Sequence, residues 1–168
     1  MEFRHTSVMP EETLAALAVK PAGTYVDCTL GGAGHARRIA DRLSPAGRLI
    51  GLDQDEAAIR AAKERLASVS CRVDVVRSNF RALDSVLQSL GVTSVDGVLF
   101  DLGVSSHQID TAERGFSYMQ DAPLDMRMDT SRLLSAHEVV NEYDEAELWR
   151  IFRDYGEERW AKRIAAFI

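Results

Sequence analysis

Over the first hundred residues, short runs of β-branched and other apolar residues alternate with segments in which apolar residues recur every three or four positions. Short apolar runs between turn residues predict strands, whereas apolar positions at helical spacing predict helices. Strands are predicted at residues 24–30, 48–52, 71–76 and 95–100. Strands that alternate with helices are typical of a parallel sheet covered by helices. The sequence therefore predicts an α/β fold.

The ends of the helices between these strands are marked by specific residues. Asp55 is placed to cap the helix that follows the second strand, and Ser78 or Asn79 is placed to cap the next one. Phe80 begins that later helix, whose apolar positions are expected to face inward, and Gly91 is expected to end it.

Residues 102–134 show no clear period, but they contain aromatic residues, methionines and several charged residues. Loops longer than about 15 residues in compact domains are usually functional or disordered, and this one is too apolar for a solvated linker. We therefore expect an ordered active-site segment. Beyond it, capping boxes that start at Ser135 and Asp144 predict two helices. The predicted divisions are an α/β domain half at 1–105, the active-site segment at 106–134 and a helical region at 135–168.

Composition places the chain among ordinary globular proteins. It has 168 residues, of which 46% are hydrophobic and 27% charged, which excludes disordered and collagen-like classes. No apolar run approaches the roughly 20 residues of a membrane helix, and the first residues lack the apolar core of a secretory signal. Cys28 and Cys71 have no CxxC spacing, so we expect reduced core thiols in a cytoplasmic protein.

The charge is unevenly divided along the chain. Residues 1–90 carry twelve basic and eleven acidic side chains, whereas residues 91–168 carry eight and fifteen. A protein that holds nucleic acid by phosphate neutralisation alone usually shows a basic stripe. The composition therefore argues against general nucleic-acid binding, and any such role must come from local patches.

A glycine-rich turn follows the first predicted strand, in the stretch Asp27-Cys28-Thr29-Leu30-Gly31-Gly32-Ala33-Gly34-His35. Glycines at a strand-to-helix turn let a ligand approach the backbone N–H groups closely. Asp53 ends the second strand, where a carboxylate can accept hydrogen bonds from both hydroxyls of a ribose. Together these features favour a nucleoside-containing cofactor over a plain strand–turn–helix with a capping acid.

The same turn favours S-adenosylmethionine over NAD. A dinucleotide fingerprint requires a third glycine, and Arg37 stands at that position. Asp27 adds a negative charge that opposes a pyrophosphate and suits a cationic sulfonium and amino group, although capping of the turn is an alternative role for it. An NAD-dependent oxidoreductase is the alternative from another class.

Other candidate residues follow the fourth predicted strand. Asp101 ends that strand, at the edge where ligands bind in open parallel sheets, and it is the candidate catalytic residue. Phe80 can stack on an adenine ring or face the core, and Gln108 is a neutral donor and acceptor near the same edge. The histidines and cysteines lack the spacing of metal ligands, so no metal site is expected, and no pattern indicates a nucleophilic Ser or Cys.

Taken together, these motifs resemble one family, the small-subunit ribosomal RNA (cytosine-N4)-methyltransferases. The most specific stretch is Asp96-Gly97-Val98-Leu99-Phe100-Asp101-Leu102-Gly103-Val104-Ser105-Ser106-x-Gln108. Further matching stretches are His5-Thr6-Ser7-Val8-Met9, Tyr25-x-Asp27-x-Thr29-Leu30-Gly31, Arg114-Gly115-Phe116-Ser117-Tyr118, Pro123-Leu124-Asp125-Met126-Arg127-Met128-Asp129, Val140-Asn141 and Tyr155-Gly156-Glu157-Glu158. Ala33 is a small departure, because glycine is usual there.

The resemblance implies a Rossmann-like fold that binds S-adenosylmethionine, with a helical insertion that helps to recognise RNA. Carried over position by position, the cofactor contacts fall on Ala33, Gly34, His35, Asp53, Phe80, Asp101 and Gln108. The implied reaction methylates the exocyclic N4 of a cytosine in small-subunit ribosomal RNA, which must be held unstacked. The candidate substrate contacts are Phe116 and Tyr118 for stacking and Arg114 and Arg127 for phosphate.

Members of that family are much longer than this chain. We therefore expect the chain to end within the helical insertion and to be the first part of a methyltransferase. The expected partner is small-subunit ribosomal RNA, free or in an assembled subunit, with no membrane association. The alternative is a truncated module that binds the cofactor without catalysis.

Overall fold

The structure, a computed structural model, describes residues 7–168. The chain divides into two compact units, Met1–His107 and Gln108–Ile168, called unit 1 and unit 2 below. The predicted boundaries after residues 105 and 134 stay predictions. The predicted opening motif at residues 5–9 lies partly outside the described residues.

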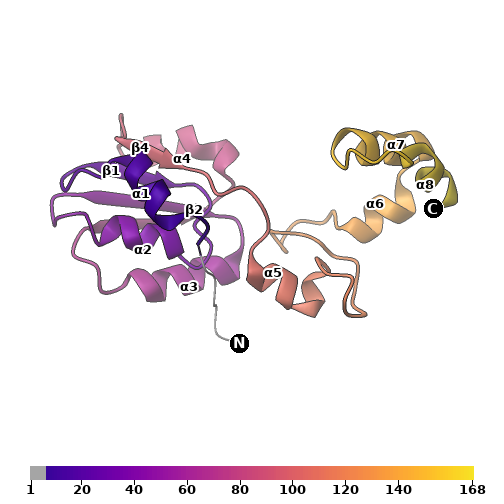
Figure 1. Cartoon of the computed structure of the whole chain (residues 1–168), viewed down its shortest axis with the longest axis horizontal. Coiled ribbons are helices and arrows are strands. Elements are labelled where there is room, and N and C mark those ends of the chain that lie inside the picture. The colour runs from indigo at the N-terminus through magenta and orange to yellow at the C-terminus, as the bar shows by residue number, and fades with distance from the viewer. Residues whose placement is uncertain (1–6) are drawn as a thin grey trace. The chain divides into compact units, whose positions relative to one another are not determined.

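Unit 1 is built on a four-stranded parallel sheet with the order β3-β2-β1-β4 (Figure 1). The strands are β1 (Thr24–Asp27), β2 (Arg48–Asp53), β3 (Arg72–Arg77) and β4 (Gly97–Leu99). The predicted α/β fold and its four strands are confirmed, but β1 and β4 are shorter than predicted. β1 ends early because the Thr29 N–H turns back to the Asp27 side chain, where it donates to Oδ1 at 3.1 Å.

The helices of unit 1 begin and end largely at the predicted signals. They are α1 (Pro10–Leu17), α2 (Gly34–Ala40), α3 (Glu56–Leu66), the 3₁₀ turn η1 (Phe80–Ala82) and α4 (Leu83–Ser89). The Asp55 carboxylate caps α3 by accepting the Ala57 N–H at 2.9 Å. Asn79, rather than Ser78, caps η1, and Gly91 follows α4 with a left-handed φ of 66°.

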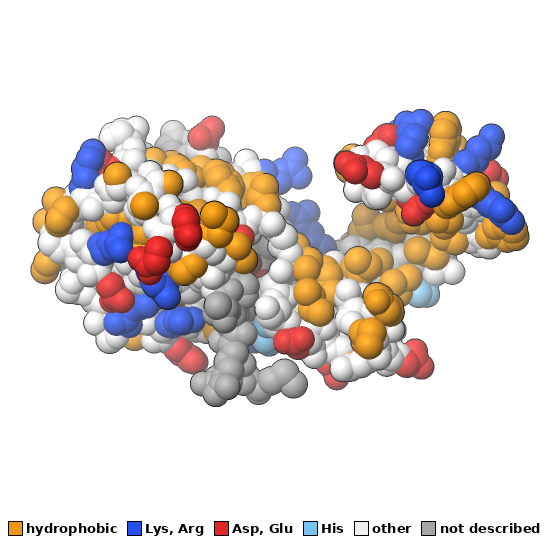
Figure 2. Space-filling model, viewed as in Figure 1, with side chains coloured by type: hydrophobic (Ala, Val, Ile, Leu, Met, Phe, Trp, Pro, Cys, Tyr) orange, Lys and Arg blue, Asp and Glu red, His pale blue; other side chains and the backbone are white. Residues whose placement is uncertain are grey.

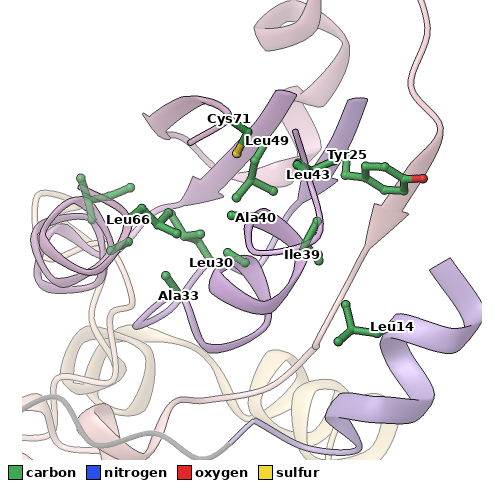
Figure 3. Close-up of a cluster of buried hydrophobic side chains, with 13 residues drawn as sticks. Leu14, Tyr25, Leu30, Ala33, Ile39, Ala40, Leu43, Leu49, Leu66 and Cys71 are labelled. Carbon is green, nitrogen blue, oxygen red and sulfur yellow. The ribbon is translucent and has the colours of Figure 1, made fainter. Parts of the chain in front are cut away.

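Apolar side chains cover both faces of the sheet. Successive residues of a strand point to opposite faces, so Tyr25 and Val26 of β1 belong to different core clusters. The Tyr25 cluster packs against α1, α2 and α3 (Figure 3), whereas the Val26 cluster packs against α4. Cys28 and Cys71 are both buried and free, as predicted. The two layers of helices leave the carboxyl ends of the strands as the edge where polar residues gather.

Unit 2 is irregular in its first part and helical in its second. Its elements are α5 (Ser106–Asp110), which begins just before the division, η2 (Ala112–Arg114), α6 (Ala136–Glu142), α7 (Glu145–Asp154) and α8 (Ala161–Phe167). Both predicted capping boxes are present, at Ser135 for α6 and at Asp144 for α7. From residue 7 onward, no helix is both long and apolar enough to cross a membrane.

Candidate functional site

Three aspartates lie at the carboxyl edge of the unit 1 sheet. Asp27 ends β1, Asp53 ends β2, and Asp101 follows β4 by two residues. Because β1 lies between β2 and β4, Asp27 is the central acid of the three. Its side chain is only 1% exposed, whereas Asp53 and Asp101 are half-buried. Ligands of open parallel sheets bind at this edge.

The charges of its two neighbours disfavour the ionisation of Asp27. Burial raises the pKa of Asp27 to about 7, and the charges of Asp53 and Asp101 contribute to the increase against the opposing hydrogen bond from Thr29. Burial also raises the pKa of Asp53, although backbone hydrogen bonds to its carboxylate lower it in part. A bound cation would relieve this repulsion, so this edge of the sheet is suited to a positively charged ligand.

The glycine turn between β1 and α2 is held from two sides. The Gly31 N–H donates to Asp53 Oδ2 at 2.8 Å, and Arg65 Nη1 of α3 donates to the Gly32 carbonyl at 3.2 Å. Gly31 has a φ of 49°, and Ala33 has a φ of 60° although its side chain is fully buried. A residue with a Cβ is strained in this left-handed region, so the surrounding contacts must hold Ala33 there.

Asp101 is linked to both ends of this turn. Its backbone N–H donates to Thr29 Oγ1 at 2.7 Å, and its Oδ2 lies 3.7 Å from Nε2 of His35, a buried residue in the first turn of α2. The sequence-predicted residues that unit 1 gathers at the carboxyl edge and its glycine turn are Ala33, Gly34, His35, Asp53 and Asp101. Their roles as cofactor contacts stay predictions.

Phe80 does not face the core as the helical pattern predicted. Residues 80–82 form a 3₁₀ turn rather than the first turn of α4, so Phe80 lies off the inward-facing stripe of that helix and is 38% exposed. Its ring packs edge-on against Phe100, with ring centroids 5.5 Å apart. The exposed ring leaves the predicted stacking on adenine open. Gln108, the remaining predicted cofactor residue, is buried in α5 and belongs to unit 2.

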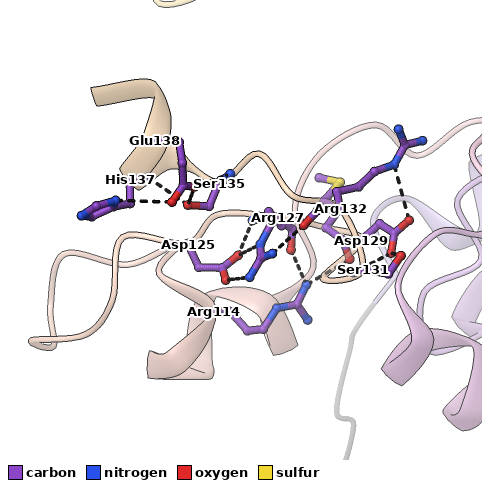
Figure 4. Close-up of polar contacts among 10 residues, drawn as sticks. Arg114, Asp125, Arg127, Asp129, Ser131, Arg132, Ser135, His137 and Glu138 are labelled. Carbon is purple, nitrogen blue, oxygen red and sulfur yellow. Dashed lines mark hydrogen bonds and ion pairs between the residues drawn. The ribbon is translucent and has the colours of Figure 1, made fainter. Parts of the chain in front are cut away.

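In unit 2, both predicted phosphate-binding arginines contact the loop that they belong to (Figure 4). Arg127 Nε donates to Asp125 Oδ1 at 2.9 Å, an interaction that lowers the pKa of Asp125, and Arg127 Nη1 donates to the Arg132 carbonyl. Arg114 Nη2 donates to the carbonyls of Arg127 and Met128 at 2.8 and 3.2 Å. The two guanidinium groups therefore organise the active-site segment, and their predicted contact with phosphate remains untested.

The two predicted stacking residues differ in exposure. Phe116 is half-buried beneath the Arg114 guanidinium, which lies 5.9 Å from the ring centroid. Tyr118 is 95% exposed. Of the two rings, Tyr118 therefore offers a face to a nucleobase with less rearrangement. Across residues 7–168, no group of three or more His, Cys, Asp or Glu side chains is arranged to hold a metal ion.

Two contributors to the site were missed by the sequence interpretation. Thr29 lies within the motif Tyr25-x-Asp27-x-Thr29-Leu30-Gly31, but nothing in the sequence shows that its hydroxyl accepts a hydrogen bond from the N–H of a residue 72 positions away. Arg65 lies on the exposed part of an amphipathic helix, and its bond to Gly32 spans 33 positions. Such contacts arise from the way in which distant segments pack together, so a sequence pattern carries no signal for them.

The parallel sheet with helices on both faces places unit 1 in the doubly wound α/β class, in which ligands bind at the carboxyl edge of the sheet. Comparison with known protein families then shows to which family the chain belongs. The MraW methylase family matches residues 2–168, and the chain belongs to that family.

Curated relatives agree with this assignment. The chain is 60% identical over 168 residues to the ribosomal RNA small subunit methyltransferase H of Symbiobacterium thermophilum and 58% identical to that of Clostridioides difficile. The match covers all of this chain but 53% and 54% of those proteins, so the chain spans about half the length of the curated relatives it matches.

A solved structure supports the fold. A Clostridium thermocellum protein thought to be an rRNA methylase superposes with a TM-score of 0.52, over 60% of this chain and 54% of that chain. The sequences are 22% identical over this match. The α/β architecture of this chain therefore also occurs in a solved structure.

Proposed function

We propose that the protein that contains this chain uses S-adenosylmethionine to methylate the exocyclic N4 of a cytosine in small-subunit ribosomal RNA. The observation that carries the proposal is the acidic carboxyl edge next to the glycine turn, in a member of the MraW methylase family. The name of these relatives, ribosomal RNA small subunit methyltransferase H, supports the substrate class. The position of the methylated atom rests on the motif resemblance.

The residues at this edge fit the cofactor chemically. When bound, S-adenosylmethionine supplies a methyl group on a positively charged sulfur, and the carboxylates of Asp27, Asp53 and Asp101 favour a positive charge. We assign the ribose to Asp53, since each carboxylate oxygen has lone pairs beyond the one that a backbone N–H uses. We assign the adenine to the exposed ring of Phe80, and backbone contacts to Ala33, Gly34 and His35. The role of Gln108 stays a prediction from the motif resemblance.

Asp101 is the proposed catalytic residue. The exocyclic amine of cytosine is a poor nucleophile because its lone pair is delocalised into the ring, so orientation of the amine is the main task of the site. The Asp101 carboxylate is 36% exposed, and its backbone is fixed by the Thr29 hydroxyl. It can therefore accept a hydrogen bond from the amine and direct the nitrogen lone pair toward the methyl group.

The helices of unit 2 carry features that suit RNA, although the unit as a whole is acidic. Trp149 of α7 and Phe167 of α8 are exposed. Figure 2 shows Lys and Arg side chains next to hydrophobic ones in this part of the chain. Arg153 stacks on Trp149, and Arg163 lies over Phe167. Stacking rings beside cationic groups bind unpaired nucleotides. These pairs and the ring of Tyr118 support ribosomal RNA as the partner, and the two free thiols support a cytoplasmic location.

The alternative of an NAD-dependent enzyme has little support at the glycine turn. Arg37 occupies the position of the third dinucleotide glycine, and its guanidinium is engaged by Asp41, the Arg65 carbonyl and Ser68. Replacing it would remove contacts between α2 and the end of α3. The alternative of a binding module without catalysis would use the same cofactor site. Only a measurement of methyl transfer distinguishes it from the proposed enzyme.

Calorimetric titration with S-adenosylhomocysteine tests the cofactor site directly. We expect saturable binding by the 168-residue chain, loss of at least tenfold in affinity in Asp53→Asn, and no change in Asp41→Asn, an exposed acid whose carboxylate meets Arg37. Absence of binding by the folded wild-type chain would contradict the proposal. Transfer of a labelled methyl group to small-subunit ribosomal RNA then distinguishes an enzyme from a binding module.

A further inference from the structure

The hydrogen-bond ladder between β1 and β4 ends in an unusual way. Beyond the two strands, the Cys28 N–H still donates to the Leu99 carbonyl at 2.9 Å, as a parallel ladder requires. In such a ladder, the next bond would run from the Asp101 N–H to the Cys28 carbonyl. The Asp101 N–H instead donates to Thr29 Oγ1 at 2.7 Å. A side-chain hydroxyl thus takes the place of a strand carbonyl at the point where the two strands separate.

The position of Thr29 explains why a side chain makes this bond. Directly after Thr29 the chain turns toward the opposite neighbour of β1, since the Leu30 N–H donates to the Leu52 carbonyl of β2 at 2.9 Å. Thr29 therefore lies where the backbone leaves the segment after β4. Its hydroxyl keeps that segment attached while the backbone departs to form the glycine turn.

The same hydroxyl also reaches the central acid of the site. Thr29 Oγ1 lies 3.5 Å from Asp27 Oδ1, the oxygen that accepts the Thr29 N–H at 3.1 Å. A hydroxyl has one donor and can accept as well, so Thr29 can accept from Asp101 and donate to Asp27 at the same time. One side chain joins the buried carboxylate to the backbone of the residue proposed to orient the substrate.

We propose that Thr29 is a positioning residue of the methyl-transfer site, which holds Asp101 at the carboxyl edge through its hydroxyl; this inference rests on the proposed function. Thr29 acts through Asp101 and needs no contact with either substrate. A valine has nearly the same shape as threonine but offers no acceptor, so Thr29→Val releases the Asp101 N–H while it keeps the packing. Serine keeps the acceptor and loses one methyl group.

Amide hydrogen exchange measured by NMR on the 168-residue chain tests the hydrogen bond at the residue concerned. In Thr29→Val, we expect the Asp101 amide to exchange about tenfold faster and the Cys28 amide, which donates to Leu99, to be unchanged. Thr29→Ser restores slow exchange at Asp101. Thr93→Val, the same change at an exposed threonine, has no effect on either amide. Unchanged exchange of Asp101 in Thr29→Val would overturn the inference.

Titration of the same variants with S-adenosylhomocysteine measures the consequence for the site. We expect affinity about tenfold weaker in Thr29→Val and within threefold of wild type in Thr29→Ser. Equal affinities of wild type and Thr29→Val would refute the positioning role and leave the proposed function intact. If the wild-type chain does not bind, the proposed function fails, and exchange at Asp101 alone decides whether Thr29 holds it. If Thr29→Val does not fold, Thr29→Ala, which removes the hydroxyl without a branched side chain, replaces it in both measurements.

Discussion

The buried carboxylate of Asp27 makes a prediction about stability that runs against the usual effect of a substitution in a core. Its pKa in the folded protein is raised to about 7 from an ordinary value of 3.8, mainly by burial. The ionised side chain is therefore less favourable in the folded than in the unfolded protein. We predict that Asp27→Asn, which resembles the neutral acid in shape, makes the protein more stable at pH 8.

The magnitude follows from the size of the shift. A folded-state pKa above the unfolded one gives a stabilising contribution that is fully present below about pH 4 and is lost as the pH rises through about 7. A difference of about three pKa units at ~1.4 kcal/mol per unit corresponds to at most about 4 kcal/mol. The free energies of unfolding of wild type and Asp27→Asn should therefore diverge by up to this amount between pH 4 and pH 8.

The assay is urea unfolding of both proteins at several pH values, followed by far-ultraviolet circular dichroism. Both tryptophans, Trp149 and Trp160, lie in unit 2, so their fluorescence recorded in parallel separates the unfolding of the two units. Carboxyl groups that do not interact with Asp27 titrate equally in wild type and variant and cancel in the difference. The pH dependence of that difference thus reports on Asp27.

A second acid of the same sheet supplies the control. Asp74 of β3 is paired with Arg48 at 2.7 Å, so Asp74→Asn should lower the stability at pH 8 by about 1 kcal/mol rather than raise it. If the stabilities of wild type and Asp27→Asn stay parallel from pH 4 to pH 8, Asp27 does not titrate differently in the folded protein. The electrostatic description of the carboxyl edge would then be wrong.

Two predictions concern unit 2. Gly115 and Gly91 both have left-handed φ values, of 69° and 66°, but a Cβ on Gly115 would overlap the Pro123 carbonyl oxygen, whereas one on Gly91 would meet no atom within 4 Å. Gly91→Ala should cost about 1 kcal/mol and Gly115→Ala more than about 2 kcal/mol in urea unfolding; equal costs would refute the steric reasoning. Tyr118→Ala should reduce methyl transfer tenfold to hundredfold with unchanged cofactor affinity, and unchanged turnover would remove its stacking role.

The features of the fold that could be predicted from sequence are those that depend on neighbouring residues. Apolar runs predict the four strands because a buried parallel strand needs apolar residues on both of its faces. Asp55 and the box at Ser135 predict helix starts because a capping side chain bonds to an N–H two or three residues along the chain. In each case the pattern and the contact lie in one short segment.

The parts that could not be predicted depend on long-range geometry. Apolar residues from Phe80 onward recur at helical spacing. Residues 80–82 nevertheless form a 3₁₀ turn that is capped by Asn79, and this turn places Phe80 away from the core. The bond between Thr29 and Asp101 depends on the register of β1 against β4. The hydrogen bonds from Arg127 to Asp125 and to the Arg132 carbonyl depend on how residues 123–132 fold back. None of these has a periodic signal.

Two unfavourable local features of unit 1 lie at the end of β1 and in the turn that follows it; Met9 and Ala18, at the two ends of α1, also have left-handed φ values. Asp27 is a buried acid whose ionisation opposes folding, and Ala33 is held with a left-handed φ although it carries a Cβ. By contrast, the caps at Asp55 and Asn79 agree with their local preferences. Natural sequences depart from such preferences mainly at functional sites, where stability is given up for binding or catalysis. An acid that weakens the fold yet sits centrally among two others is best explained by a ligand whose positive charge reverses its effect. The buried acid at the centre of the three therefore supports the carboxyl edge as the proposed cofactor site, on grounds that do not depend on the family resemblance.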